Sequence, residues 1–291
     1  MTAEPMRRFQ YLAPHRLDEA LSLLTPETVP LAGGTDLFLR MERRQTQPDA
    51  VVDLKRIPGM DRIEPSDGGL RIGALALMQT LAVSSLTVNG YGALAESARV
   101  VGSIQTRNRA TIGGNLANAS PAADTATPLL ALGAMAEASH VDGTRELTLE
   151  QLFLGPGRTA LKDGELLTAI RIPAMTGRTG SSFQRCVRTA MDIAVVNCAA
   201  FVRLDEDGAI QDAGVALGAV GPTPLRAASA ESCLRGRPFD LDVAAEAAEC
   251  AADDARPIDD VRAGADYRRE MVRVLTRRAI ESAFQRARGN T

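Results

Sequence analysis

The sequence predicts an α+β fold with two regions of different strand arrangement, followed by a C-terminal unit of strands and helices. Residues 1–55 alternate helical and extended patterns, and residues 56–175 contain Asp142-Gly143, a pair typical of a hairpin turn. Residues 176–291 place two extended runs before three helical segments. Alternating strands and helices favour a parallel sheet, whereas strands joined by hairpins form antiparallel sheets.

The first region predicts a small parallel sheet. Residues 17–24 carry leucine and alanine at helical spacing, and residues 29–31 have the pattern of a short strand. A Gly-Gly pair and an amphipathic helix with Leu37, Phe38 and Met41 on one side follow this strand. The run 51–54 then predicts the next strand, which completes a strand–loop–helix–strand order.

The second region predicts antiparallel strands with helices between them. Residues 69–74 and 166–172 have strand-like patterns, and residues 93–101 are helical in pattern. A further helix is expected to begin at Ser120-Pro121, because serine is a good N-cap and proline suits the first helical position.

A domain boundary is expected near residue 175. The segment 175–182 is rich in glycine and hydroxyl side chains and has no apolar periodicity. Two extended runs follow, and Asp207-Gly208 between them is a hairpin signature. The runs span residues 192–202 and 210–220, and the helices are expected near 224–235, 241–254 and 266–287.

Composition and charge exclude several classes of function. The formal net charge of −3 does not favour a general binder of nucleic acid. No apolar run of roughly twenty residues occurs, so no membrane span is predicted. No apolar signal core follows Arg7-Arg8, and a cytoplasmic location is expected. The cysteines are widely spaced and are interpreted as reduced, mostly buried side chains rather than as disulfides or as ligands of a metal or iron–sulfur site; they are Cys186, Cys198, Cys233 and Cys250.

Two glycine pairs are the most informative motifs of the chain. They are Ala32-Gly33-Gly34-Thr35-Asp36 and Thr111-Ile112-Gly113-Gly114-Asn115. A strand that ends in Gly-Gly before a helix leaves backbone N–H groups unpaired, and the absent side chains let a phosphate approach the backbone. Because hydroxyl or amide donors flank both pairs, the pairs predict two backbone cradles for the two phosphates of a dinucleotide.

Two acidic residues near these loops need an interpretation. A carboxylate beside a pyrophosphate is repelled, so we expect Asp36 to cap the first N–H groups of its own helix. Asp124 is either a first-turn acid favoured by the helix dipole or an acceptor for ribose hydroxyls, and the sequence supports both equally. A third motif, at 155–160, has the letters of a dinucleotide fingerprint, but no strand precedes it and we interpret it as a loop.

A longer string of residues carries a family resemblance. It runs from Val101-Gly102-Ser103 through the second glycine pair to Ala119-Ser120-Pro121 and Asp124. It resembles the FAD-binding subunit of the xanthine dehydrogenase and aerobic carbon monoxide dehydrogenase family of molybdenum hydroxylases. Residues 31–37 are similar to the first FAD loop of that family, and residues 218–226 to part of its C-terminal domain. The resemblance covers nearly the whole chain, in order.

The resemblance implies a two-subdomain FAD-binding module of the PCMH type, followed by a C-terminal domain with a three-stranded antiparallel sheet and helices. The module would span residues 1–175, with subdomains of about 1–55 and 56–175, and the C-terminal domain residues 176–291. FAD would lie extended with its pyrophosphate between the two glycine loops, Asp124 at a ribose and Leu167 near the ring system. The implied cofactor-binding residues are Leu31, Ala32, Gly33, Gly34, Thr35, Asp36, Val101, Thr111, Ile112, Gly113, Gly114, Asn115, Asn118, Asp124, Leu167 and Arg185.

Two positions depart from the family pattern. Gln184-Arg185 stands where relatives often place a lysine near the flavin. Val101 stands where some relatives stack an aromatic side chain on the flavin, so a more open ring face is expected.

The resemblance also implies a role within a larger assembly. The chain would hold one FAD, and its partners would be a large molybdopterin subunit and a small subunit with 2Fe–2S clusters, in a dimer of heterotrimers. Electrons would arrive from a cluster and leave to an external acceptor, which requires no acid–base pair and no metal in this chain. Two alternatives stay open: a free-standing FAD oxidoreductase, and a scaffold subunit that has lost its flavin.

Overall fold

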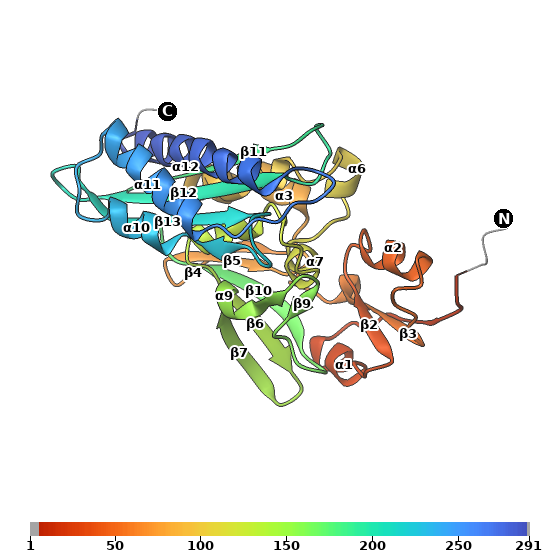
Figure 1. The fold of residues 1–291 in the computed structure, drawn as a ribbon. Helices are drawn as coiled ribbons and strands as arrows, with labels where there is room; N and C mark the ends of the chain where they lie inside the picture. Colours follow the sequence, from red (N-terminus) through yellow and green to blue (C-terminus); the bar gives the residue numbers. More distant parts are fainter. Residues whose placement is uncertain (1–5, 290–291) are drawn as a thin grey trace.

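The computed structural model describes residues 6–289; residues 1–5, part of the segment considered for a signal sequence, lie outside this range. The chain forms three main sheets of three, five and four strands. Figure 1 shows the small N-terminal sheet to one side of the five-stranded sheet, and the four-stranded sheet beside the long C-terminal helix. Among the helices in the described range, none combines the length and the apolar character needed to cross a bilayer.

The N-terminal region builds the parallel sheet that its strand–helix alternation predicts. Its elements are β1 (Gln10–Leu12), α1 (Leu17–Ser22), β2 (Thr28–Leu31), α2 (Leu37–Glu42), β3 (Ala50–Asp53) and the 3₁₀ turn η1 (Leu54–Arg56). The strand order is β1-β3-β2, and both pairings are parallel. Leu31, Met41 and Val51 form a small core that belongs to this region alone.

The middle region forms the predicted antiparallel sheet, in the order β4-β5-β10-β6-β7 (β4, Ile63–Ser66; β5, Gly69–Gly73; β10, Leu166–Ile172; β6, Met135–His140; β7, Gly143–Thr148). Every pairing in this sheet is antiparallel. The other elements are α3 (Met78–Val83), α4 (Ser85–Gly90), α5 (Gly92–Arg99), α6 (Ile104–Arg107), α7 (Ile112–Ala117), α8 (Ala126–Ala131), α9 (Leu149–Leu152), β8 (Phe153–Gly155) and β9 (Arg158–Thr159).

Three local expectations in the middle region were wrong. The hairpin turn is Val141-Asp142, one residue earlier than expected, because Gly143 already pairs with His140 in the sheet. The helix expected from Ser120 begins at Ala126, since the Ser120 hydroxyl accepts a hydrogen bond from the N–H of Ala122 (3.3 Å) and forms a local turn instead. The segment 155–160, expected to be a loop, contributes to the short hairpin of β8 and β9.

The C-terminal region contains antiparallel strands and the three expected helices. Its first strand begins at Arg178, inside the segment 175–182 that was expected at the domain boundary, and the run expected from residue 192 is a strand only from Val196. A fourth strand of two residues extends the predicted three-stranded sheet, giving the order β11-β12-β13-β14. The expected boundary near residue 175 falls between β10 and the start of β11. The elements are β11 (Arg178–Cys186), β12 (Val196–Leu204), β13 (Ile210–Gly218), β14 (Leu225–Arg226), α10 (Ala228–Leu234), α11 (Leu241–Asp254) and α12 (Ala265–Ala287).

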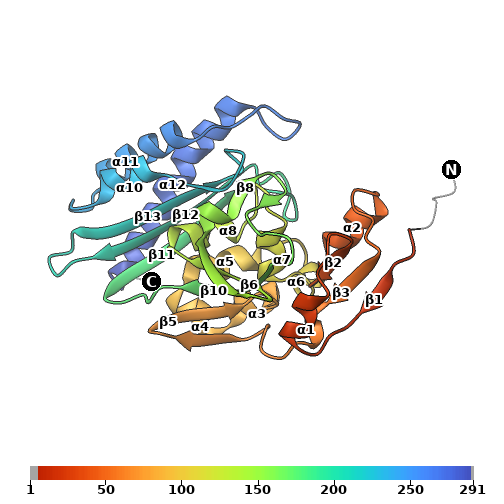
Figure 2. The same ribbon diagram turned by 90° about the horizontal axis from the view of Figure 1, so that it is seen from below.

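The central strands of this sheet are mostly apolar and buried because both of their faces are covered. Along β12, Ala199 and Phe201 pack into the core of the middle region, whereas Cys198 and Val202 pack beneath the C-terminal helices. α12 packs across β11 and β12, and α8 packs on β12 and β13 (Figure 2). The sheet therefore joins the C-terminal helices firmly to the middle region.

Candidate functional site

The two glycine loops meet where the N-terminal region contacts the middle region. A Cβ atom at Gly33 would lie 1.9 Å from the carbonyl oxygen of Arg109, so only glycine fits where the first loop touches the segment that leads into the second. A Cβ atom at Gly114 would lie 3.9 Å from the Cβ of Ala32. In both ribbon views α7 is next to the N-terminal region (Figures 1 and 2). The fold thus brings together two motifs that are far apart in the sequence.

The first loop has four consecutive backbone N–H groups without an acceptor. The N–H groups of residues 33–36 donate no hydrogen bond to any residue in the described range. The carbonyl groups of Gly34 and Asp36 are engaged, because they accept from the first turns of α2. Gly34 has φ +81°, a conformation that favours glycine. Consecutive free N–H groups in a loop are donors that can bind an anion.

Asp36 does not cap α2, contrary to expectation. It occupies the N-cap position, but its side chain makes no capping hydrogen bond. Its backbone is helical (φ −99°, ψ −40°), whereas a capping side chain requires the extended backbone that is typical of an N-cap. The first N–H groups of α2 therefore stay available.

Lys55 places an ammonium group on the first loop, a contact that sequence reasoning missed. Its Nζ atom donates to the carbonyl oxygen of Ala32 (3.2 Å) and to the carboxylate of Asp53 (2.6 Å). Burial raises the pKa of Asp53, but hydrogen bonds from Lys55 and Tyr11 outweigh burial and hold this pKa below its ordinary value. The available signal was the position just after β3, because the carboxyl ends of parallel strands meet at one edge of a sheet.

The second loop uses its backbone differently. The N–H groups of residues 112–115 all donate within the chain: to the carbonyl oxygens of Ala76 and Ala74, to the Thr111 hydroxyl and to the Thr111 carbonyl oxygen. Thr111 is the N-cap of α7, and its hydroxyl accepts from the N–H of Gly114 at 3.1 Å. The expectation of unpaired N–H groups was therefore wrong for this loop, because a neighbouring segment and the cap satisfy them.

The two glycines of the second loop also differ from each other. A Cβ atom at Gly113 would lie 2.6 Å from the carbonyl oxygen of Ala74, so this glycine permits close backbone packing. At Gly114 a Cβ atom would meet only the Thr111 hydroxyl (2.9 Å) and Ala32. Gly114 is therefore the glycine of this pair that leaves room beside the first loop.

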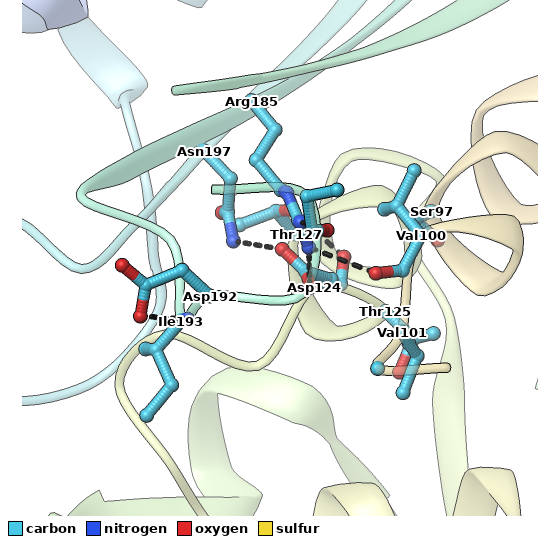
Figure 3. A network of polar contacts seen from close by, with 12 residues as sticks. Ser97, Val100, Val101, Asp124, Thr125, Thr127, Arg185, Asp192, Ile193 and Asn197 are labelled. Atoms are coloured by element: carbon cyan, nitrogen blue, oxygen red, sulfur yellow. Dashed lines mark hydrogen bonds and ion pairs between the residues drawn. The ribbon is translucent and has the colours of Figure 1, made fainter. Parts of the chain in front are cut away.

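Asp124 lies in a buried polar network with Arg185 and Asn197 (Figure 3). Arg185 Nη1 lies 2.7 Å from Asp124 Oδ2, and Asn197 Nδ2 donates to Asp124 Oδ1 at 3.0 Å. Burial raises the pKa of Asp124, and the charge of Arg185 with the two hydrogen bonds acts in the opposite direction. Because α8 begins at Ala126, Asp124 lies outside its first turn, and the helix-dipole interpretation was wrong.

Arg185 connects this network to two other segments. Its guanidinium donates to the carbonyl oxygens of Val100 and Ala190, each at 3.0 Å. The second glycine loop joins the same region, because the Thr125 hydroxyl donates to Asn115 Oδ1 at 2.6 Å. The structure therefore brings the surroundings of Val101, Asp124 and Arg185 close to the second loop.

Sequence reasoning missed Asn197. Its side chain is fully buried on β12, and its Oδ1 atom has no hydrogen-bond partner among the described residues. The available signal was a polar side chain inside the apolar run 195–202. A buried amide needs polar partners, so its presence in such a run indicates a neighbour such as Asp124.

The remaining predicted residues lie at different depths. Leu167 on β10 is 4% exposed and belongs to the main core, as does Ile112. Leu31 belongs to the N-terminal core, and Val101 is half-buried against the main core. Asn118 ends α7, and its N–H donates to the carbonyl oxygen of Gly114.

Comparison with known proteins covers almost the whole chain. The family model described as the FAD binding domain in molybdopterin dehydrogenase matches residues 7–175. The model described as the CO dehydrogenase flavoprotein C-terminal domain matches residues 181–283.

Similar proteins match over almost their full length. The xanthine dehydrogenase FAD-binding subunit of Escherichia coli O157:H7 is 32% identical, over 97% of this chain and 99% of that protein. The glyceraldehyde dehydrogenase medium chain of Sulfolobus acidocaldarius is also 32% identical, over 94% and 97%. The solved structure of carbon monoxide dehydrogenase from Hydrogenophaga pseudoflava, in a form that lacks the Mo-pyranopterin moiety of its cofactor, matches with a TM-score of 0.92 and 32% identity, over 97% of this chain and 99% of that chain. The chain belongs to the family of FAD-binding subunits of molybdopterin dehydrogenases, and its cofactor is FAD.

Proposed function

We propose that this chain is the electron-transfer subunit of a molybdenum hydroxylase complex, in which it holds FAD between its two glycine loops. The observation that carries this proposal is the group of four free N–H groups at residues 33–36, which faces a second glycine loop across Gly33 and Gly114. Free backbone donors and absent side chains are what a pyrophosphate requires. The described residues therefore fit the cofactor of the family.

The first loop would bind the pyrophosphate through its backbone. The N–H groups of residues 33–36 and the hydroxyl of Thr35 are the donors, and Lys55 adds a positive charge that is anchored on the carbonyl oxygen of Ala32. Asp36, whose carboxylate a phosphate would repel, is an exposed residue.

The second loop would contact the cofactor mainly through its side chains, and its buried residues would hold the loop in place. Thr111, Gly114, Asn115 and Asn118 are proposed to contact the cofactor, whereas Ile112 and Gly113 support the loop through their buried packing on the main core. A backbone that is already saturated with hydrogen bonds cannot offer its N–H groups to a second anion.

Asp124, Arg185, Val101 and Leu167 are proposed to line the site beyond the second loop. Asp124 would accept from a ribose hydroxyl, and Arg185 would hold its carboxylate in place through the 2.7 Å ion pair. Val101 and Leu167 would supply apolar contact near the ring system. FAD, when bound, supplies electron transfer in one- or two-electron steps, and the chain supplies binding and orientation.

The partners would be a large molybdopterin subunit and a small 2Fe–2S subunit, assembled as a dimer of heterotrimers. Electrons would come from the 2Fe–2S clusters and pass to an external acceptor. Relatives named for xanthine, glyceraldehyde and carbon monoxide are all 32% identical to this chain, which supports a role that is independent of the substrate. A cytoplasmic location is part of the proposal, and in such a reducing compartment the cysteines would be kept as thiols.

The proposal is tested by purifying the tagged chain, alone and after co-expression with candidate large and small subunits. After desalting, the released cofactor is identified by mass spectrometry and counted per chain. One FAD per chain and two copurifying subunits are expected. FAD without any partner would favour a free-standing oxidoreductase, and a complex without flavin would favour a scaffold subunit; either result overturns the proposal.

A further inference from the structure

Two cysteines that are distant from the glycine loops lie in contact with each other. Cys233 is on α10 and Cys250 is on α11, and their sulfur atoms are 2.7 Å apart. The two helices are neighbours in both ribbon views (Figures 1 and 2). Both side chains are half-buried, whereas Cys198 is fully buried. The sequence, with no C-x-x-C pair, gave no indication of this contact.

We propose that hydrogen peroxide oxidises Cys233 and Cys250 to a reversible disulfide that links α10 to α11. A disulfide requires a separation of about 2.05 Å between its sulfur atoms, so a small approach of two helices that already pack together completes the bond. The inference rests on the contact between the two thiols and does not depend on the proposed function.

The two thiols take different parts in the proposed reaction. Burial, together with the hydrogen bond to Cys233, raises the pKa of Cys250 to about 12, so Cys250 stays protonated at neutral pH. Arg237 Nη1 donates to the carbonyl oxygen of Cys233 and forms an ion pair with Glu246 at 2.7 Å. We write the reaction with Cys233 as the attacking sulfur and Cys250 as the resolving one, and exchanging these roles gives the same disulfide.

The reaction balances with hydrogen peroxide as the oxidant. The Cys233 thiolate attacks one oxygen, the O–O bond breaks, and a sulfenic acid forms with release of one water after proton uptake. The sulfur of Cys250 then attacks the Cys233 sulfur, the S–O bond breaks, and a second water leaves with the thiol proton. The two cysteines together lose two electrons and two protons, and a thiol reductant reverses the bond.

The test treats the folded full-length chain with hydrogen peroxide, blocks the remaining thiols and counts them by intact mass. We expect the free thiols to fall from four to two, and dithiothreitol to restore all four. Trypsin cuts after Arg235, between the two cysteines, so the cross-link joins two separate peptides that mass spectrometry identifies.

Three variants make the result decisive. Cys233→Ser and Cys250→Ser should each abolish the cross-link, whereas Cys186→Ser, which changes a half-buried cysteine on β11, should leave it intact. The oxidised wild-type chain should also unfold at a higher temperature than the reduced chain, and this difference should be absent in Cys233→Ser. Four free thiols after treatment, or oxidation of Cys233 to a sulfinic acid without a cross-link, would overturn the proposal.

Discussion

The two glycine loops have the same pattern in sequence and use their backbones in opposite ways. In the first loop the N–H groups of residues 33–36 have no acceptor in the described part of the chain, whereas those of residues 112–115 are all bonded within it. The difference arises from what lies beside each loop. The second loop runs along Ala74 and Ala76, which supply carbonyl oxygens, and its own Thr111 supplies a cap.

The two pairs share a division of roles between their glycines. The first glycine of each pair, Gly33 or Gly113, permits the backbone of another segment to approach closely. The second glycine lies where a loop must turn or stay open: Gly34 has a positive φ, and Gly114 faces Ala32 with little in between. In both loops the first glycine of the pair therefore allows close packing, and the second allows a turn or an open position. Whether the N–H groups of the pair are free depends on the acceptors that surround it.

The largest effect is expected from Gly33→Ala. The new Cβ atom would lie 1.9 Å from the carbonyl oxygen of Arg109, and a backbone atom cannot turn away as a side chain can. We expect a loss of about 1–3 kcal/mol or more in the free energy of unfolding and no retained FAD, because the loops must separate. Thermal unfolding and FAD content measure both. Gly90→Ala, with nothing within 4 Å of its Cβ position, is the matched control and should change neither. Unchanged values for Gly33→Ala would show that the loops do not touch.

Gly114→Val should separate binding from folding. The Cβ atom would meet the capping hydroxyl of Thr111 (2.9 Å), which must shift, rather than backbone, and Gly114 has a helical backbone that accepts a side chain. We expect a folded protein whose FAD retention after desalting is abolished, since a branched side chain would occupy the approach path of the phosphate. Gly114→Ala, which adds the Cβ atom alone, should retain an intermediate amount. Full flavin occupancy in Gly114→Val would remove the second loop from the site.

Asp124→Ala tests whether side chains near the second loop bind FAD. Loss of one hydrogen-bonded group should weaken FAD affinity by roughly 1–3 kcal/mol. Stability should fall as well, because Arg185 loses its buried partner. Titration of the flavin-free protein with FAD gives the affinity, and thermal unfolding gives the stability. Arg185→Met shares the stability loss but keeps the carboxylate. If both variants lower stability and neither changes the affinity, the network is structural only.

Much of the fold could be predicted because it depends on local patterns. The helices at 241–254 and near 266–287 and the strand at 166–172 were expected from their local sequence patterns, and the structure confirms them. The start of α8 was missed because the Ser120 hydroxyl serves a local turn, and sequence alone does not show which N–H group it bonds.

The sequence indicates candidate residues for the site but not the contacts that these residues make. The letters of the two glycine loops are conspicuous, yet the acceptors at Ala74 and Ala76 come from a different part of the chain. The same is true of Lys55 on the first loop and Asn197 beside Asp124. Contacts of this kind depend on how the strands are arranged, which local patterns do not encode.

The smallest expected effect is on the pH dependence of stability, to which Asp53 near the first loop and Asp124 near the second contribute with opposite sign. The pKa of Asp53, which anchors Lys55 on the first loop, is lowered, so its contribution to stability is present above the ordinary carboxyl pKa of 3.8 and is lost as the pH falls below it. The pKa of Asp124 is raised, so the folded state binds its proton more tightly, and stability declines as the pH rises above 3.8.

Urea unfolding over the acidic pH range measures this contrast in the wild-type chain and two matched variants. Asp53→Asn should reduce the loss of stability as the pH falls below 3.8. Asp124→Asn should reduce the loss of stability as the pH rises above 3.8. Each variant serves as the control for the other. Each removes one carboxylate, Asp53 near the first glycine loop or Asp124 near the second. If both substitutions change the curve of stability against pH in the same direction, the two carboxylates have similar environments. The difference between the two loops would then be limited to their backbone hydrogen bonds.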